Sequence, residues 1–374
     1  MKHPGRVCHP SNVTVTPDGS RSWIAVTLAA VALLAGGCGG QMTAQKPPPS
    51  PPAPRASDFV GIYADDVFFG DASYRRDALA QQRAAGVEMI RQPFGWADFV
   101  REPARFDDFV GAAADAHIRV LPVLLGPDPG ASADGGMKPP AQPERFAGWA
   151  ALLVQRYGPG GSFWTDHPKT PKLPITSWQV WNEPNIPAFW APKPDPAAYA
   201  QLLRTTAQSI RKVDARAEVV AAGLPTSHLG VPAPDFLAGV YKAGAKGSFD
   251  TAAVHPYAPN PDAVIQRVKS LQRVIANNDD SAKVWVTEVG WGTGGKPGPL
   301  TVTPDRQAGY VKETLTRLHE LGVRGVVIFQ WRDPKPFPGR RAIWPYYAGL
   351  LDQDGKPKPS LAAFTAAAAA TRQR

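Results

Sequence analysis

Residues 177–185 read Ser-Trp-Gln-Val-Trp-Asn-Glu-Pro-Asn, a largely apolar run that stops abruptly at an amide, a carboxylate and a proline. The run over residues 177–182 has the near-continuous hydrophobicity of a strand that is buried on both faces. Pro184 cannot donate to a sheet ladder, so the strand should end at Glu183. In a parallel barrel, a carboxylate at the C-terminal end of a strand points into the mouth, where the chemistry happens.

Seven similar runs flank this one and alternate with amphipathic stretches. The eight predicted strands cover residues 59–64, 88–92, 119–125, 177–182, 218–223, 251–257, 284–288 and 325–330. The predicted helices cover residues 74–85, 106–116, 143–157, 196–213, 234–243, 261–277, 304–321 and 361–371. Several of these helices begin with Pro and stop at Gly, as helix ends often do. Eight strands alternating with helices predict a (β/α)8 TIM barrel over residues 57–374.

The alternative fold is an open, doubly wound sheet. That fold would favour a Gly-rich phosphate loop after the first strand. The residues there are instead Asp65, Asp66, Val67 and Phe68, which do not form such a loop.

Two long loops, residues 126–142 and 332–349, follow the third and eighth strands and would lie on the catalytic face of a barrel. Helix N-termini are expected near Asp195, Asp262 and Thr303, as caps or first-turn residues.

The segment before residue 57 differs in composition from the rest of the 374-residue chain. Residues 1–37 contain an apolar run that ends in Leu-Ala-Gly-Gly before Cys38, which predicts a signal peptide of the lipoprotein type. Lipidated Cys38 would then begin a Pro-rich tether over residues 38–56 and anchor the protein to a membrane surface outside the cytoplasm. The alternative is cleavage to a secreted soluble protein. Cys8 is the one other cysteine, so we expect no intrachain disulfide in the folded domain.

Charge and motifs exclude several classes of function. The formal net charge of +9 is spread along the chain without a dense Lys/Arg block, so we expect no nucleic-acid partner. The sequence has no His-Glu-x-x-His motif, cysteine pair or dense Asp cluster, so we expect no metal and no other cofactor. It also lacks a Gly-x-Ser-x-Gly esterase elbow and a Walker loop.

A second carboxylate lies in the same setting as the first. Residues 283–291 read Lys-Val-Trp-Val-Thr-Glu-Val-Gly-Trp, which puts Glu288 at the end of the seventh predicted strand. Cleavage of a glycosidic bond needs an acid that protonates the leaving oxygen and a carboxylate that faces the anomeric carbon. Glu183 and Glu288, on the fourth and seventh strands, can converge across the barrel axis and form that pair.

The two motifs resemble those of clan A glycoside hydrolases, and families 5 and 39 are the most similar patterns. The resemblance covers roughly residues 58–365 and rests on Trp-Asn-Glu-Pro on strand four and Thr-Glu-Val-Gly-Trp on strand seven. It implies that Glu183 is the acid/base and Glu288 is the nucleophile of a retaining mechanism. It also implies that Asn182 binds the 2-hydroxyl group of the sugar.

Further residues match the clan pattern. Arg91 corresponds to an arginine near the nucleophile, His255 and Tyr257 to a strand-six pair, and Trp331 to the aromatic platform under the cleaved sugar. Trp190 and Trp291 are additional candidates for the substrate site, and Phe189 beside Trp190 could form part of its wall. Trp96, Trp344, Asp65 and Asp66 are weaker candidates.

The sequence thus predicts a retaining O-glycosyl hydrolase that acts as a monomer on an oligo- or polysaccharide. Two alternatives remain open. A transglycosylase would use the same residues, because only the acceptor differs. A non-catalytic carbohydrate-binding lipoprotein would retain the barrel without turnover, although the two intact glutamates argue against it.

Overall fold

The strands form one parallel sheet that closes into a barrel. The computed structural model describes residues 58–130, 137–226, 229–335 and 342–373. The strands are β1 (Val60–Tyr63), β2 (Met89–Gly95), β3 (Arg119–Leu125), β4 (Ser177–Val180), β5 (Glu218–Val220), β6 (Leu224–Pro225), β7 (Thr251–His255), β8 (Lys283–Val289) and β9 (Val326–Ile328). Their order in the sheet is β5-β4-β3-β2-β1-β9-β8-β7-β6, and a pairing of β5 with β7 joins the ends.

β5 and β6 are two pieces of one barrel strand, so the nine strands fill eight positions. β5 pairs with β4 and touches β7 at Val220↔Thr251, and β6 continues along β7 at Leu224↔Val254. The sequence predicted one unbroken strand over residues 218–223. The (β/α)8 barrel itself is confirmed.

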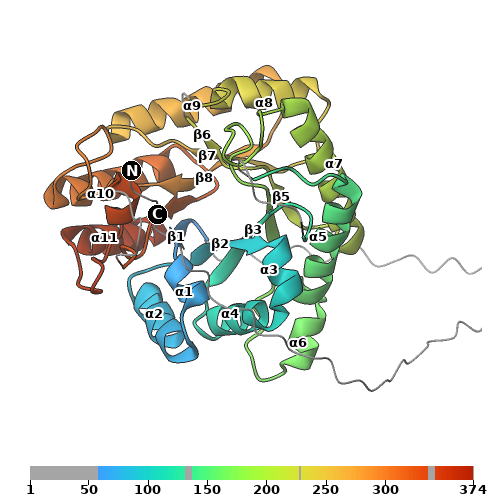
Figure 1. Cartoon of the computed structure of the whole chain (residues 1–374). Helices are drawn as coiled ribbons and strands as arrows, with labels where there is room; N and C mark the ends of the chain where they lie inside the picture. Colours follow the sequence, from blue (N-terminus) through green and yellow to red (C-terminus); the bar gives the residue numbers. More distant parts are fainter. Residues whose placement is uncertain (1–57, 131–136, 227–228, 336–341, 374) are drawn as a thin grey trace, which may run out of the picture. The chain divides into compact units, whose positions relative to one another are not determined.

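Helices form an outer ring around the sheet (Figure 1). They are α1 (Asp65–Phe69), α2 (Ala72–Ala84), α3 (Trp96–Arg101), α4 (Pro103–Asp115), α5 (Pro143–Tyr157), α6 (Ser162–Asp166), α7 (Pro196–Val213), α8 (Ala233–Lys242), α9 (Pro261–Asn277), α10 (Pro304–Glu320), the 3₁₀ turn η1 (Trp344–Tyr347) and α11 (Pro359–Arg372). The short helices α1, α3 and α6 were not predicted. Among the described helices, none is long and apolar enough to cross a bilayer.

Local signals explain where the long helices start. Asp195 caps α7 by accepting hydrogen bonds from the Ala197 and Ala198 amides, and Thr303 caps α10. α9 is capped by Asn260, and the predicted Asp262 lies in its first turn, where a negative charge complements the helix dipole.

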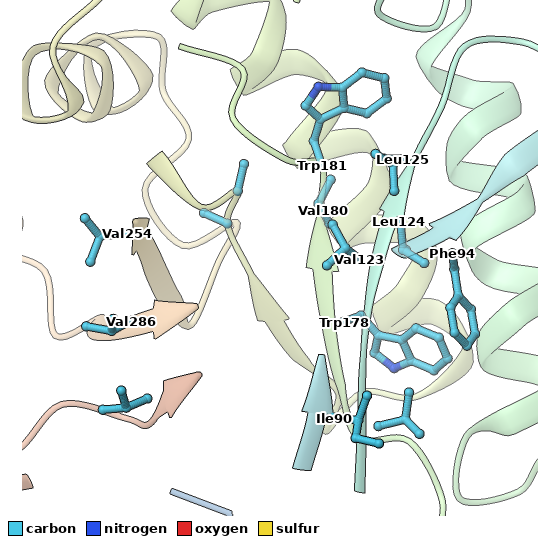
Figure 2. Packing of buried hydrophobic residues seen from close by; sticks show 14 of the residues in the cluster. Ile90, Phe94, Val123, Leu124, Leu125, Trp178, Val180, Trp181, Val254 and Val286 are labelled. Atoms are coloured by element: carbon cyan, nitrogen blue, oxygen red, sulfur yellow. The ribbon is translucent and has the colours of Figure 1, made fainter. Parts of the chain in front are cut away.

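The core has two layers. Outside the strands, side chains such as Trp178 and Phe94 pack between sheet and helices (Figure 2). Inside the barrel, Met89, Leu121, Val220, Ala253, Trp285 and Val327 form a separate cluster. Because strand side chains alternate, the residues two positions further along these strands also face inward, toward the C-terminal mouth. This parity brings Arg91, Val123 and His255 to the site described below.

β8 departs from regular alternation. Val286 pairs with Val326, whereas Val289 pairs with Ile328, so β8 contains one residue more than β9 between these two pairs. Such a bulge re-aims the side chains that follow it. It allows both Thr287 and Glu288 to reach the interior of the barrel, which strict alternation would forbid.

A buried ion cluster closes the opposite end of the barrel. Arg324 donates two hydrogen bonds to Asp58 (2.8 and 3.0 Å) and two to Glu218 (both 3.1 Å), and its guanidinium lies 4.4 Å from the centre of the Trp285 ring. Burial raises the pKa of Glu218, but the Arg324 charge and hydrogen bonds outweigh this and hold the pKa below its usual value. Arg324 therefore compensates two carboxylates that are largely removed from water.

The predicted leader (residues 1–37), Cys38 and the tether (residues 38–56) lie outside the described residues.

Replacing Arg324 should destabilise the barrel strongly. In Arg324→Met, Asp58 and Glu218 keep their burial but lose their cation, and we expect a loss of about 3 kcal/mol or more in unfolding free energy at neutral pH. Urea denaturation followed by circular dichroism measures it. The control Arg317→Met removes solvent-facing ion pairs with Asp262 and Glu313 and should cost at most about 1 kcal/mol. Equal losses in the two variants would contradict the assigned role of Arg324.

Candidate active site

Glu183 lies just beyond β4 on a backbone in an uncommon conformation. Trp181 and Glu183 both have positive φ angles, 73° and 47°, which non-glycine residues adopt rarely and often at functional sites. The turn is held by a bridge between Asn182 and Gly223 and by the Glu183 amide, which donates to the Gly223 carbonyl (3.1 Å). The predicted strand over residues 177–182 thus ends early, and its last residues turn toward the barrel mouth.

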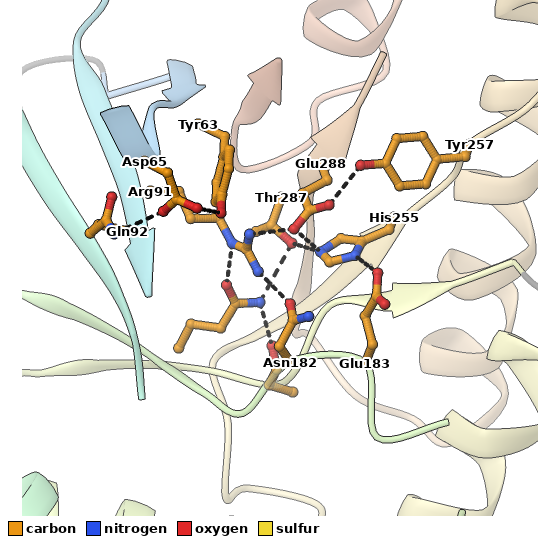
Figure 3. A network of polar contacts seen from close by, with 12 residues as sticks. Tyr63, Asp65, Arg91, Gln92, Asn182, Glu183, His255, Tyr257, Thr287 and Glu288 are labelled. Atoms are coloured by element: carbon orange, nitrogen blue, oxygen red, sulfur yellow. Dashed lines mark hydrogen bonds and ion pairs between the residues drawn. The ribbon is translucent and has the colours of Figure 1, made fainter. Parts of the chain in front are cut away.

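Arg91 is buried inside the barrel and binds three residues at once (Figure 3). Its Nη1 donates to Glu288 Oε1 (2.6 Å), its Nη2 to Asn182 Oδ1 (2.7 Å) and its Nε to Gln179 Oε1 (2.8 Å). Arg91 was expected at the end of its strand, but β2 continues to Gly95 and Arg91 lies within it. Charge-assisted hydrogen bonds of this kind set both position and orientation.

Glu288 is surrounded by donors and positive charge. The Tyr257 hydroxyl donates to its Oε2 (2.6 Å), opposite the Arg91 contact on Oε1. Burial raises the pKa of Glu288, yet His255, Arg91 and the Tyr257 hydrogen bond together hold it below the usual range for a glutamate. Burial and the Glu288 charge also raise the pKa of Tyr257 well above its usual value, so Tyr257 stays a donor. Glu288 is therefore a carboxylate at neutral pH.

His255 lies between the two glutamates. Its Nδ1 is 2.7 Å from Glu183 Oε1, and its Nε2 is 3.1 Å from Thr287 Oγ1 and 3.7 Å from Glu288 Oε1. The ring fits because residue 223 is glycine: a Cβ there would come within 2.0 Å of His255 Nε2. The imidazole thus links the environments of Glu183 and Glu288 through one rigid, fully buried ring.

The two carboxylates are close to each other. One oxygen of Glu183, one oxygen of Glu288 and a ring nitrogen of His255 all lie within 4.8 Å of one another. Such a set could in principle hold a metal ion, although the sequence predicted none. Arg91 and His255 already contact the carboxylate oxygens, and the Arg91 charge opposes a cation at Glu288. The group suits acid–base and nucleophilic chemistry better.

A second polar group borders the same space. The Tyr63 hydroxyl donates to Asp65, which also accepts a hydrogen bond from Gln92 (3.1 Å). Burial raises the pKa of Asp65, and these two hydrogen bonds offset part of the rise. Asp66 instead accepts a hydrogen bond from Tyr74, away from this group. Of the two acids considered at the end of the first strand, Asp65 is the one close to Arg91 and Glu288.

These side chains surround a pocket of about 220 Å³. Its walls are Tyr63, Arg91, Pro93, Val123, Leu125, Asn182, Glu183, Phe189, Glu288 and Phe329. The volume is below the roughly 300–1,000 Å³ typical of pockets for drug-sized ligands. The pocket therefore has room for a single small ring, directly against both carboxylates.

The aromatic residues are placed differently from the expectation. Trp331 is 1% exposed and is not among the pocket walls, whereas Phe329 lines the pocket and stacks on Tyr63 with ring centres 5.1 Å apart. The chain leaves β9 after Ile328, so the first ring beyond the strand is the one at the mouth. Trp344 joins this group by packing edge-on against Tyr257 (4.9 Å).

The other tryptophan candidates belong to the core. Trp291 is fully buried and donates to the Ala258 carbonyl (2.7 Å). Trp190 packs against Trp181 and Tyr199, and its neighbour Phe189 is the one that reaches the pocket. Trp96 stacks on Trp149. A tryptophan close to the site in the sequence can pack equally well in the hydrophobic core or against a substrate. The sequence context therefore did not distinguish core tryptophans from pocket tryptophans.

Sequence reasoning missed Gln179, Thr287 and Gly223. Gln179 accepts from Arg91, and its Nε2 donates to the Ala221 carbonyl (3.3 Å) and lies 3.5 Å from Thr287 Oγ1. A glutamine inside an apolar strand was an available signal, since a fully buried amide needs partners. Nothing in the sequence around Gly223 showed that a histidine ring would lie against it.

The fold is that of several solved glycosidases. No family model and no curated protein matches the sequence. A monomeric β-xylosidase from Caulobacter crescentus CB15 superposes with a TM-score of 0.62 and 21% identity, over 82% of this chain and 67% of that one. The GH39 enzyme from Xanthomonas axonopodis pv. citri gives 0.60 and 19%, over 84% and 66%.

An exo-β-1,4-mannosidase from Opitutaceae bacterium strain TAV5 gives a TM-score of 0.58 and 17% identity, over 85% of this chain and 62% of that one. The chain thus spans about two thirds or less of the length of these neighbours. Family 39 and family 5 enzymes are both among the similar structures, which confirms the expected resemblance at the level of the fold.

Gly223→Ala should displace His255. The added Cβ cannot coexist with the present ring position, so the contacts of Nδ1 with Glu183 and Nε2 with Thr287 should be lost together. Selective ¹⁵N labelling of the seven histidines checks this, with the His255 signals assigned from a His255→Gln variant. Gly148→Ala, where a Cβ meets nothing within 4 Å, is the control. Unchanged His255 ring shifts in Gly223→Ala would refute the packing argument.

Proposed function

We propose that this protein is a retaining O-glycosyl hydrolase in which Glu288 is the nucleophile and Glu183 is the acid/base. The observation that carries the proposal is the approach of the two carboxylates to within 4.8 Å. Retaining glycosidases keep their carboxyl groups about 5–5.5 Å apart, whereas inverting enzymes need roughly 6.5–9.5 Å to admit a water molecule. The glycosidases of similar fold support the same reaction class.

The first step uses the difference between the two glutamates. Glu288, kept ionised by its donors, attacks the anomeric carbon while the bond from that carbon to the leaving oxygen breaks. Glu183 gives its proton to the leaving oxygen. His255, 2.7 Å from Glu183 Oε1, orients this carboxyl group and exchanges no atoms with the sugar.

The second step reverses the proton transfer. Water attacks the anomeric carbon of the glycosyl-enzyme, its proton passes to Glu183, and Glu288 leaves as a carboxylate. The carboxamide oxygen of Asn182 accepts a hydrogen bond from Arg91, so the NH₂ group of Asn182 is the donor for the 2-hydroxyl of the sugar. Phe329, in place of Trp331, supplies the aromatic surface of the pocket.

The setting belongs to the proposal as well. A lipidated Cys38 and the Pro-rich segment after it would hold the barrel at a membrane surface outside the cytoplasm, where an oligo- or polysaccharide substrate is accessible. The barrel would act there as a monomer.

Covalent trapping tests the nucleophile. A panel of activated 2-deoxy-2-fluoro glycosides should leave one glycosyl adduct on the protein, measured by intact mass and located at Glu288 by peptide mapping. Glu288→Gln should form no adduct and lose turnover about 10⁴-fold or more, whereas Glu144→Gln, on the outer surface of α5, should behave as wild type. No adduct and no turnover by the wild-type protein across the panel would favour a non-catalytic binding protein. Full turnover by Glu288→Gln would show that Glu288 is not the nucleophile.

The pH profile tests the electrostatics of Glu288. The Tyr257 hydroxyl stabilises the charged form of Glu288, so Tyr257→Phe should raise the Glu288 pKa. Turnover needs Glu288 as a carboxylate. The acidic limb of the pH profile should therefore lie at a higher pH in the variant than in the wild-type protein. The pH dependence of kcat/KM measures this, with Tyr310→Phe, which packs on Trp291, as control. An unmoved acidic limb would show that Tyr257 does not act on Glu288.

A further inference from the structure

The walls of the pocket are chemically divided. Arg91, Asn182, Glu183 and Glu288 supply its polar side, from β2, the end of β4 and β8. The side formed by β2 and β3 is apolar: Pro93, Val123 and Leu125 line it, and Phe189 joins them from the loop after Glu183. Among the described wall residues, none on this second side carries a hydrogen-bonding side-chain group.

Among the described residues, the backbone groups that point between β2 and β3 are already paired. β2 and β3 are in register from Met89↔Arg119 to Gly95↔Leu125, so the ladder uses the amides and carbonyls that the two strands direct toward each other. At the outer edge of β3, the Leu124 carbonyl accepts from the Trp181 amide (2.8 Å). A hydroxyl group pressed against Val123 or Leu125 would therefore lose its water without gaining a hydrogen bond from these side chains or from the paired backbone between β2 and β3, which is costly.

The order of the walls indicates which part of a sugar meets this side. In the proposed function, C1 lies against Glu288 and the 2-hydroxyl against Asn182. From β4, the neighbouring strands round the barrel are β3, β2, β1 and β9. Continuing round the sugar from C2, carbons C3 and C4 face Leu125, Val123 and Pro93, and C5 and the ring oxygen face Tyr63 and Phe329.

We propose that the cleaved sugar has an apolar C3–C4 edge, as in a sugar deoxygenated or O-methylated at C3 or C4. Pro93, Val123 and Leu125 are then the residues that determine specificity, because they accept carbon-bound hydrogens and reject a free hydroxyl. The inference rests on the proposed function and deepens it by naming the substrate class. An apolar wall discriminates moderately against an added hydroxyl group, by up to about a hundred-fold.

Matched 4-nitrophenyl glycosides test this. Each parent sugar (gluco, galacto, manno and xylo) is compared with its 3-deoxy, 4-deoxy, 3-O-methyl and 4-O-methyl forms. For at least one position we expect kcat/KM to exceed that of the parent about ten-fold. Comparing the deoxy with the O-methyl substrates distinguishes removal of the hydroxyl group from its methylation. The methyl ether keeps the electron-withdrawing oxygen, whereas the deoxy sugar lacks it.

The modified and parent glycosides also differ in intrinsic reactivity, and comparing their kcat/KM ratios between protein variants cancels that difference. Val123→Thr places a hydroxyl in the wall with little change in shape, and it should lower the ratio of modified to parent kcat/KM at least about five-fold. Val120→Thr is the matched control. Val120 precedes Leu121, which faces the barrel interior, so alternation turns Val120 outward, and it is not among the pocket walls. Its ratio should stay at the wild-type value. Leu125→Asn is a second wall variant should Val123→Thr not fold, as judged by thermal unfolding.

The outcomes distinguish the two levels of the proposal. Turnover with an adduct on Glu288, but with the free hydroxyl preferred at both C3 and C4, would overturn the apolar-edge inference and leave the glycosidase standing. Ratios that are the same in Val123→Thr, Leu125→Asn and Val120→Thr would also overturn it. Absence of turnover and of any adduct in every arm would overturn the glycosidase, and the inference with it.

Discussion

The site depends on the threefold contact of Arg91. One buried guanidinium binds the carboxylate of β8, the amide at the end of β4 and the interior glutamine of β4, so two strands on different sides of the barrel share one cation. Arginine side chains carry a charge in proteins, and the planar guanidinium of Arg91 holds Glu288 and Asn182. Arg91 thus helps His255 and Tyr257 to lower the pKa of Glu288, and it also orients Asn182.

The rest of the mouth follows from this constraint. Thr287 faces inward two residues after Trp285 and contacts His255, and the bulge in β8 is what allows Glu288 to face inward beside it, where Arg91 and Tyr257 hold it. His255 in turn has a place only because Gly223 lacks a side chain. The two glutamates therefore differ in their hydrogen-bond partners. Glu288 accepts hydrogen bonds from Arg91 and Tyr257, whereas Glu183 contacts the buried His255.

Much of this could be expected from local patterns. Continuous apolar runs and Pro–Gly helix boundaries led to the eight-fold barrel, because buried parallel strands have few polar residues and helix ends have distinct backbone needs. Arg91, Asn182, Glu183, His255, Tyr257 and Glu288 were named from motifs at predicted strand ends, and the structure brings all six together. Trp331 was placed in the site by analogy, and Trp190 and Trp291 were candidates that lie close to the two glutamates in the sequence. All three are instead buried outside the pocket walls.

By itself, the sequence determined the order of strands and helices and the carboxylates at two strand ends, since periodicity and the chemistry of proline and glycine act over a few residues. Tertiary structure alone decided the spacing of those carboxylates, the role of Gly223 and the choice of Phe329 over Trp331. Those features depend on register, on a one-residue bulge and on side chains from strands more than a hundred residues apart. No local pattern carries that information, because each contact is made between segments that meet only when the barrel closes.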